Sequence, residues 1–188
     1  MLRELARLQT DMRQPPHISL VEHWLDLFRD GGNTVPSIQD IDPCRLGRHL
    51  PDICILDHEG GDDFRFRLTG ETVKGLYGGS VKGRLLGDLV EEPTASRLLE
   101  MAHAILARPL AILHGLSGMQ PAWNYSVALQ RISLPLADRY GAIRHIISAT
   151  VCHTYEGGVV SGEYQHCYAI PALPPAGLVP GAGQTAAA

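Results

Sequence analysis

The strongest helical pattern of the chain, at residues 94–108, is followed at once by three β-type segments, and this order constrains the fold more than any other feature. The helix has one apolar face, and Pro93 precedes it. The segments cover residues 110–116, 125–136 and 143–155, and Gly141 can take positive φ in the turn that joins the last two. Consecutive strands of this kind favour antiparallel pairing, so we predict an antiparallel sheet with the helix on one face.

Two shorter strands are predicted before that helix. Residues 53–57 form an apolar run, and residues 64–68 alternate between apolar and charged after a Gly/Asp-rich turn. The alternation predicts that Phe64, Phe66 and Leu68 face the core while Arg65 and Arg67 face water. Many glycines between residues 70 and 90 predict short helices joined by tight turns. The complete order predicts an α+β domain with five antiparallel strands.

The N-terminal region is also predicted to be helical. Residues 2–8 have apolar side chains at helical spacing, and Pro15 and Pro16 stop this helix. A second helix is predicted to begin at Ser19, which forms a capping-box pattern with Glu22, and to end at residues 31–32, a Gly-Gly pair.

One face of this second helix is too apolar to face water alone. It must pack on the domain, on a second copy of the chain, or on both. We therefore predict a homodimer, with Trp24→Glu shifting the mass in solution toward the monomer. The residues predicted to form the interface are Val21, Trp24, Leu25 and Phe28.

Composition limits the class of protein. A chain of 188 residues with 45% hydrophobic and 19% charged residues can bury a core. The net charge of -4 gives no basic surface for nucleic acid. No window approaches the roughly 18 apolar residues of a membrane span, and no secretory signal is recognisable at the N-terminus. We expect a cytoplasmic protein with neither nucleic acid nor membrane as partner.

The chain divides into three predicted parts. Residues 1–18 are predicted to form an N-terminal helical extension, and residues 19–156 the domain together with its N-terminal helix. Residues 157–188 are predicted to be a C-terminal segment that ends in a flexible tail rich in Pro, Gly and Ala.

Several short motifs, taken in order, resemble one known family. Its members have a Trp-bearing helix, matched here by Trp24, and then five short patterns: "lPsr-x-diDP", "LP-x-hhhhD", "f-x-x-R-l-x-G", "tGr-x-l" and an "LPL" strand with a turn. The matching segments are residues 35–43, 50–57, 64–70, 82–86 and 134–138. Their order and spacing, from about residue 19 to residue 154, resemble the stand-alone bacterial PAS-type family (PAS_5-like) once described as a domain of unknown function.

The resemblance implies the PAS fold, a five-stranded antiparallel sheet with short helices and one long helix on one face, here preceded by N-terminal helices. It also implies a sensory or signalling function, in which the domain binds a small ligand or a partner protein. Because the chain has no room for an output domain, we expect it to signal through contact with another, unidentified protein.

A small-molecule pocket is expected between the sheet and the helices. Its predicted lining consists of side chains that are soft or have a polar tip, although the same residues could simply complete the core. The candidates are Tyr77, Met101, His103, Trp123 and Tyr125.

Haem is the most specific cofactor hypothesis. Some PAS domains hold haem through a histidine of the long helix, and His103 lies on that helix. However, His103 is flanked by Leu99 and Leu106, as a structural histidine would be, and axial ligation also needs a large apolar slot. We therefore predict no cofactor and keep haem at His103 as the alternative.

Other sites are not favoured by the sequence. The "N-C-R-F-L-Q" box of photoactive flavin domains is absent. Adjacent residues rarely converge on one ion, so the pairs at 152–153 (Cys-His) and 166–167 (His-Cys) do not predict a metal site.

Three functions remain open. The first is a sensory domain that binds a ligand, and the second is a dimerisation or interaction module without one. The third, a cone-shaped isomerase-type enzyme, ranks last, because His145 and His153 have no evident carboxylate beside them and no G-x-S-x-G motif occurs. We thus predict no enzyme activity and no catalytic residues.

Overall fold

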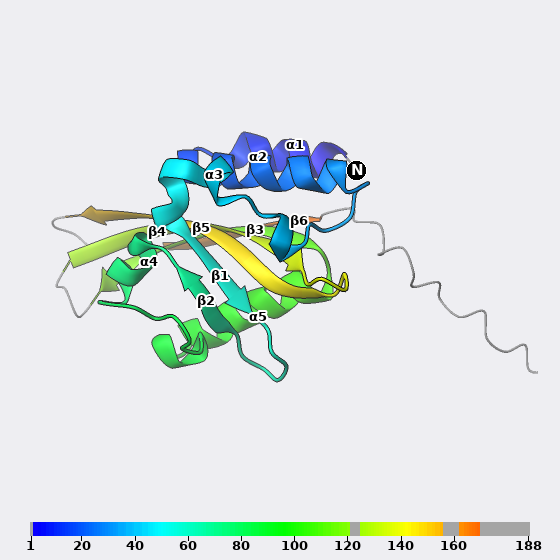
Figure 1. The fold of residues 1–188 in the computed structure, drawn as a ribbon. Coiled ribbons are helices and arrows are strands. Elements are labelled where there is room, and N and C mark those ends of the chain that lie inside the picture. Colours follow the sequence, from blue (N-terminus) through cyan, green and yellow to red (C-terminus); the bar gives the residue numbers. More distant parts are fainter. Residues whose placement is uncertain (1, 121–124, 156–161, 170–188) are drawn as a thin grey trace, which may run out of the picture.

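The structure, a computed structural model, describes residues 2–120, 125–155 and 162–169, and its centre is one antiparallel sheet (Figure 1). The strand order is β2-β1-β5-β4-β3-β6. The strands are β1 (Ile53–Asp57), β2 (Arg65–Thr69), β3 (Leu110–Gln120), β4 (Tyr125–Ala137), β5 (Ile143–Tyr155) and β6 (Gly162–Ala169). The helices are α1 (Leu2–Asp11), α2 (Pro15–Asp30), α3 (Pro43–Leu46), α4 (Glu71–Leu76) and α5 (Thr94–Ala107), with 3-10 turns η1 (Ile38–Asp40), η2 (Gly47–Asp52) and η3 (Gly87–Leu89).

Helices cover both faces of the sheet (Figure 1). Helices α1 and α2 lie on one face, and α4 and α5 lie on the other. The side chains of β5 alternate accordingly: Ile147 and Ala149 belong to the α2-side core, and Ile146 to the α5-side core. No helix in the described part of the chain is long and apolar enough to cross a membrane.

The sheet has six strands, so the prediction of five was wrong. The extra strand, β6, pairs antiparallel with β3 from Leu110↔Ala169 to Ser117↔Gly162. It lies inside the segment 157–188 that the sequence pattern sets apart from the domain. The reason is physical: β3 is eleven residues long and would otherwise be an open edge, and pairing satisfies its backbone groups. The tail predicted to be flexible, residues 170–188, lies outside the described residues.

The start of α2 also differs from the prediction. The helix begins at Pro15, so Ser19 lies inside it and does not cap it. Proline is well suited to the first turn, because its φ is already helical and its missing N–H would have no partner there. Pro15 and Pro16 therefore begin α2, while α1 has already ended at Asp11.

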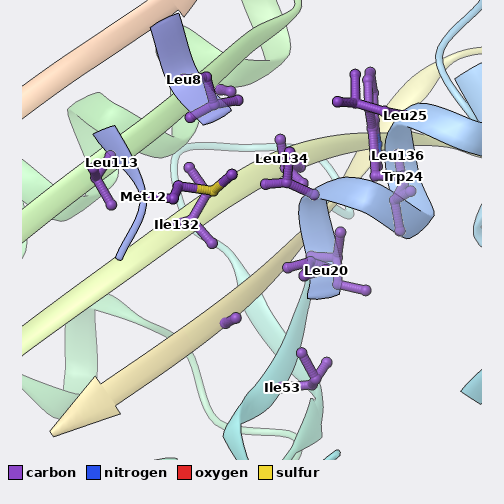
Figure 2. Close-up of a cluster of buried hydrophobic side chains, with 14 of the residues drawn as sticks. Leu8, Met12, Leu20, Trp24, Leu25, Ile53, Leu113, Ile132, Leu134 and Leu136 are labelled. Carbon is purple, nitrogen blue, oxygen red and sulfur yellow. The ribbon is translucent and has the colours of Figure 1, made fainter. Parts of the chain in front are cut away.

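The apolar face of α2 is buried within the single chain, which corrects the predicted dimer interface. Val21, Trp24, Leu25 and Phe28 are all 0–2% exposed. They pack against the sheet with Leu8 and Met12, as Figure 2 shows for part of this cluster. The apolar face of α2 thus packs on the sheet of its own chain. It is therefore not available as a contact surface for a second copy. A homodimer through another surface stays a prediction.

The faces of β2 follow the predicted alternation only in part. Phe64 and Phe66 are buried, but Leu68 is 43% exposed, contrary to the prediction. The pairing of β1 with β2 shifts between Ile55 and Leu56, because Ile55 pairs with Leu68 and Leu56 with Phe66. A bulge of this kind breaks the two-residue period, so Leu68 leaves the core face.

Candidate functional site

A small internal cavity lies between α5 and the sheet. Its volume is about 30 Å³. Leu98, Met101 and Ile105 of α5 form one wall, and side chains from β1, β3, β4 and β5 form the other. A cavity of this size holds about one or two waters.

The sheet wall of this cavity is partly polar. Arg131 of β4 lies between two partners in the sheet, His114 of β3 and Thr150 of β5. The Arg131 Nε–H donates to Thr150 Oγ1 at 2.9 Å, and both residues are buried. In the next row, the hydroxyls of Ser133 and Ser148 are 2.9 Å apart. A charged and hydroxylated patch thus faces the apolar side chains of α5.

Two cysteines lie near this patch. Burial raises the pKa of the Cys54 thiol, and it raises the pKa of Cys152 to about 11. Both thiols are therefore protonated at neutral pH, which makes them poor nucleophiles and poor metal ligands. Cys167, on β6, is separated from β5 by two strands, and the described residues contain no group of three or more side chains placed to bind a metal.

The predicted pocket residues have different locations. Met101 lines the cavity. Tyr77 packs against the same core, with its ring 6.3 Å from that of Phe66. Tyr125 is the first residue of β4 and pairs with Gln120, while Trp123 lies outside the described residues.

His103, the candidate haem ligand, lies on the outer side of α5. It does not line the cavity but faces a broad surface hollow beside Glu100 and Asp62. Its Nε2 lies 3.0 Å from the Asp62 carbonyl oxygen, and its ring contacts the rings of Phe64 and His58. Because its Nε2 is engaged, and because the hollow that it faces is open to solvent and lined in part by Asp62, Ser96 and Glu100, the residues around His103 do not form the enclosed apolar slot that a haem needs.

Sequence reasoning did not find the polar side chains of the cavity. Arg131, Ser133 and Ser148 alternate with apolar residues, a pattern that normally indicates a strand with one face in water. Here α5 covers that face. One feature of the sequence could have indicated these residues. The predicted strands contain several polar side chains on a face that the predicted long helix would cover, and such side chains would be buried.

A family comparison decides the identity of the domain. The sequence pattern of the family PAS_5, described as "PAS domain", matches residues 12–150. The match covers well over half of the chain, and it includes the sheet from β1 almost to the end of β5.

The chain belongs to the PAS domain family.

No curated protein matches this PAS domain. Among solved structures, the PAS domain from Bordetella pertussis BvgS is similar, with 18% identity, a TM-score of 0.44, and coverage of 56% of this chain and 79% of that one.

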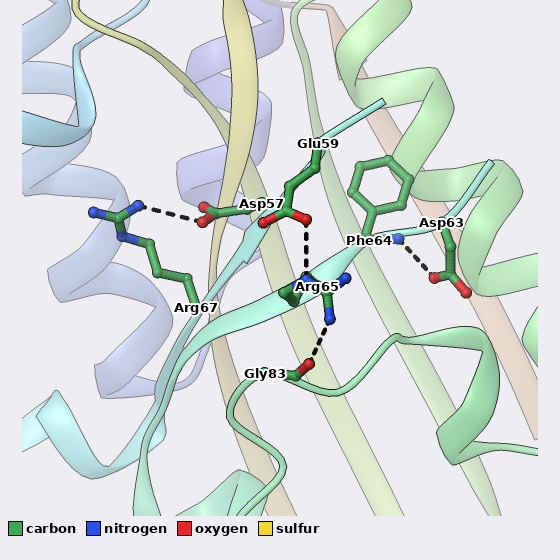
Figure 3. A network of polar contacts seen from close by, with 7 residues as sticks. All are labelled: Asp57, Glu59, Asp63, Phe64, Arg65, Arg67 and Gly83. Atoms are coloured by element: carbon green, nitrogen blue, oxygen red, sulfur yellow. Dashed lines mark hydrogen bonds and ion pairs between the residues drawn. The ribbon is translucent and has the colours of Figure 1, made fainter. Parts of the chain in front are cut away.

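The structure explains several residues of the PAS motifs at the β1–β2 hairpin. Arg67 contacts Asp57 at 3.2 Å, and Arg65 binds both Glu59 and the carbonyl oxygen of Gly83 (Figure 3). The segment around Gly83 then bonds along the outer edge of β2, where the Gly83 N–H donates to the Phe66 carbonyl at 2.7 Å. The residues of these motifs therefore stabilise the β1–β2 hairpin, and the segment around Gly83 covers the outer edge of β2.

His145 contacts the same hairpin, and the prediction that it lacks a neighbouring carboxylate is wrong. Its Nδ1 lies 2.7 Å from Asp57 Oδ1, so it does have a carboxylate beside it. The pairing of β1 with β5 places Asp57 opposite His145, a long-range contact that the sequence does not reveal. This pair lies on the α2 side of the sheet and does not line the cavity.

Proposed function

We propose that this PAS domain is a sensory module that binds a small ligand between α5 and the sheet and passes the signal to a partner protein by contact. The observation that supports it is the internal cavity, which has an apolar wall on α5 and a partly polar wall on the sheet. Ligand pockets commonly combine mostly apolar linings with a few polar groups that fix orientation.

The signal would leave through α5. This helix forms the outer wall of the cavity, and the outward side chains of Ser96 and Glu100 are exposed. Because the cavity is only about 30 Å³, a ligand larger than a few atoms must move α5 away from the sheet. A partner that contacts the outer face of α5 would then respond to occupancy.

The second candidate is an interaction module without a ligand. The small cavity volume favours it, because side chains already fill most of the space between α5 and the sheet. In this case the domain would bind its partner with unchanged affinity in the presence or absence of small molecules.

Native mass spectrometry and an absorption spectrum of protein purified from its own host test the two candidates. We expect an added mass that disappears on denaturation. The same spectrum gives the mass of the assembly and so tests the predicted homodimer. A protein that carries no added mass, and whose amide NMR spectrum is unchanged by a library of small metabolites, would contradict the sensory function and favour the interaction module.

A further inference from the structure

Arg131 is a buried cation without a counter-ion in the described chain. It is 8% exposed, and its Nε–H donates to Thr150 Oγ1. It forms no ion pair with any residue that the structure describes. An arginine side chain has five N–H donors, so both terminal nitrogens still have donors to offer. The terminal nitrogens keep some contact with solvent, because neither is among the fully buried atoms without a partner. A cation so far removed from bulk water is still costly, and proteins normally pair it.

No ion pair joins Arg131 to an acidic residue in the described part of the chain. The nearby Asp52 has other partners: its Oδ1 accepts from the Thr72 hydroxyl at 2.6 Å, and its Oδ2 lies 4.0 Å from His49 Nδ1. The thiols of Cys54 and Cys152 are protonated, because burial raises both pKa values. The neighbours that share the cavity wall are His114 and the hydroxyls of Ser133 and Ser148, which can donate hydrogen bonds as well as accept them.

We propose that this cavity binds a small organic acid, with its carboxylate on the guanidinium of Arg131 and a short apolar chain against Met101 and the rest of the α5 wall. This inference rests on the proposed function and names the class of ligand. The two terminal nitrogens of a guanidinium match the two oxygens of a carboxylate.

The volume of the cavity limits the size of the acid. A space of about 30 Å³, enough for one or two waters, favours a planar carboxylate over a bulkier phosphate, and a chain attached to it must displace side chains of the α5 wall. Met101 is unbranched and adapts more readily than its neighbours, so the chain should extend toward it. Longer chains would displace α5, which connects chain length to the signal.

The test is a titration of the wild-type protein with sodium acetate, butyrate and hexanoate at constant ionic strength, followed by amide NMR shifts and by melting temperature. Butyramide is the neutral match for butyrate, and inorganic phosphate is the alternative anion. We expect shifts in α5 and β4 with the carboxylates and none with butyramide or phosphate.

Arg131→Gln and the control Arg139→Gln assign the binding to one side chain. Arg139 is exposed on the β4–β5 turn, so its loss changes the net charge equally. We expect Arg131→Gln to weaken butyrate binding at least about tenfold and the control to leave it unchanged. Arg131→Gln should also melt at or above the wild-type temperature, because it removes an unpaired buried charge. If Arg131→Gln does not fold, Arg131→Lys, which keeps the charge without the fork, should bind butyrate more weakly than the wild type.

The outcomes separate this inference from the proposed function. Two results would overturn the organic-acid assignment and leave ligand sensing intact. Butyramide could bind as strongly as butyrate, or Arg131→Gln could bind butyrate as strongly as the wild type. Preference for phosphate would also overturn it. If none of the probes shifts the cavity amides, the organic-acid assignment fails, and the metabolite library then decides whether ligand sensing fails with it.

Discussion

His17, in the first turn of α2, is a titratable side chain held in the core at 1% exposure. Burial lowers its pKa from 6.5 to about 4, although backbone carbonyls of Gln130 and Ala149 act in the opposite direction. Its Nε2 is buried and has no hydrogen-bond partner among the described residues. The folded protein thus holds a neutral imidazole at neutral pH.

This histidine should make stability depend on pH. In the unfolded chain it takes up a proton near pH 6.5, and in the folded protein only near pH 4. Its contribution is therefore fully present above pH 6.5 and is lost as pH falls toward 4, by about 3 kcal/mol. Urea unfolding at several pH values measures it, and His17→Leu should flatten the curve in that window.

His153→Leu is the matched control, since His153 is exposed on β5. Its curve should retain the slope of the wild type between pH 4 and 6.5. An unchanged slope in His17→Leu would show that another group is responsible.

Gly70 is a second position where one side chain decides stability. A Cβ at this residue would lie 2.2 Å from the Pro51 carbonyl oxygen, a contact with rigid backbone. We expect Gly70→Ala to destabilise the protein by about 2 kcal/mol or more, because β2 must move away from η2. In contrast, Gly75→Ala meets nothing within 4 Å and should be neutral or stabilising by about 0.5–1 kcal/mol. Thermal unfolding of the two variants compares them, and equal melting temperatures would refute the clash.

At the scale of elements, α2 is fixed to the sheet by Trp24. The indole N–H donates to the Pro135 carbonyl at 2.8 Å, and the ring stacks on Phe28 at a centroid distance of 5.2 Å. Pro135 lies beyond the last residue that β3 pairs with, so its carbonyl is available for this contact. This one hydrogen bond therefore satisfies the Pro135 carbonyl of β4 and also fixes the position of α2 on the sheet.

Removing that hydrogen bond should weaken the attachment of α2. Trp24→Phe leaves the Pro135 carbonyl buried without its donor, so we expect a loss of about 2–3 kcal/mol in urea unfolding. Phe28→Leu disturbs the same stack without touching the hydrogen bond, and should lose only about 1 kcal/mol. If Phe28→Leu were the more damaging variant, stacking would outweigh the hydrogen bond. Trp24→Glu would place a carboxylate in the core, and we now expect unfolding instead of a monomer.

Elements differ in how far sequence predicts them. The long helix α5 and strands β1 to β5 were predicted, because their periodicity and turn residues are local. The start of α2, the exposure of Leu68 and the strand β6 were not, because each depends on pairing with a distant segment. Arg131 was missed for the same reason: alternation alone places it in water, and only the packing of α5 shows that it is buried.

At the scale of the whole molecule, β6 is the edge strand beside β3 and contacts α1. The Tyr168 hydroxyl donates to Asp11 Oδ2 at 2.7 Å, and the Tyr168 ring belongs to the α2-side core. The last described strand thus supports the first helix, at opposite ends of the sequence.

Deleting β6 should therefore affect both stability and association. Two shortened chains are compared, one ending at residue 169 and one at residue 160, so that they differ only by the strand and its approach. We expect the shorter chain to melt lower and to form larger species in light scattering, because the edge of β3 is exposed. Equal melting temperatures and equal masses would show that β6 is dispensable.

A sheet that separates two cores also allows two independent opening events. Amide hydrogens of α5 can exchange with solvent when only the α5-side core loosens, whereas those of β4 and β5, paired on both sides and covered on both faces, exchange only when the whole domain unfolds. Deuterium uptake by α5 therefore measures the opening of the α5-side core separately from the unfolding of the whole domain. The ligand that we propose would enter through that opening while the α2 side stays folded.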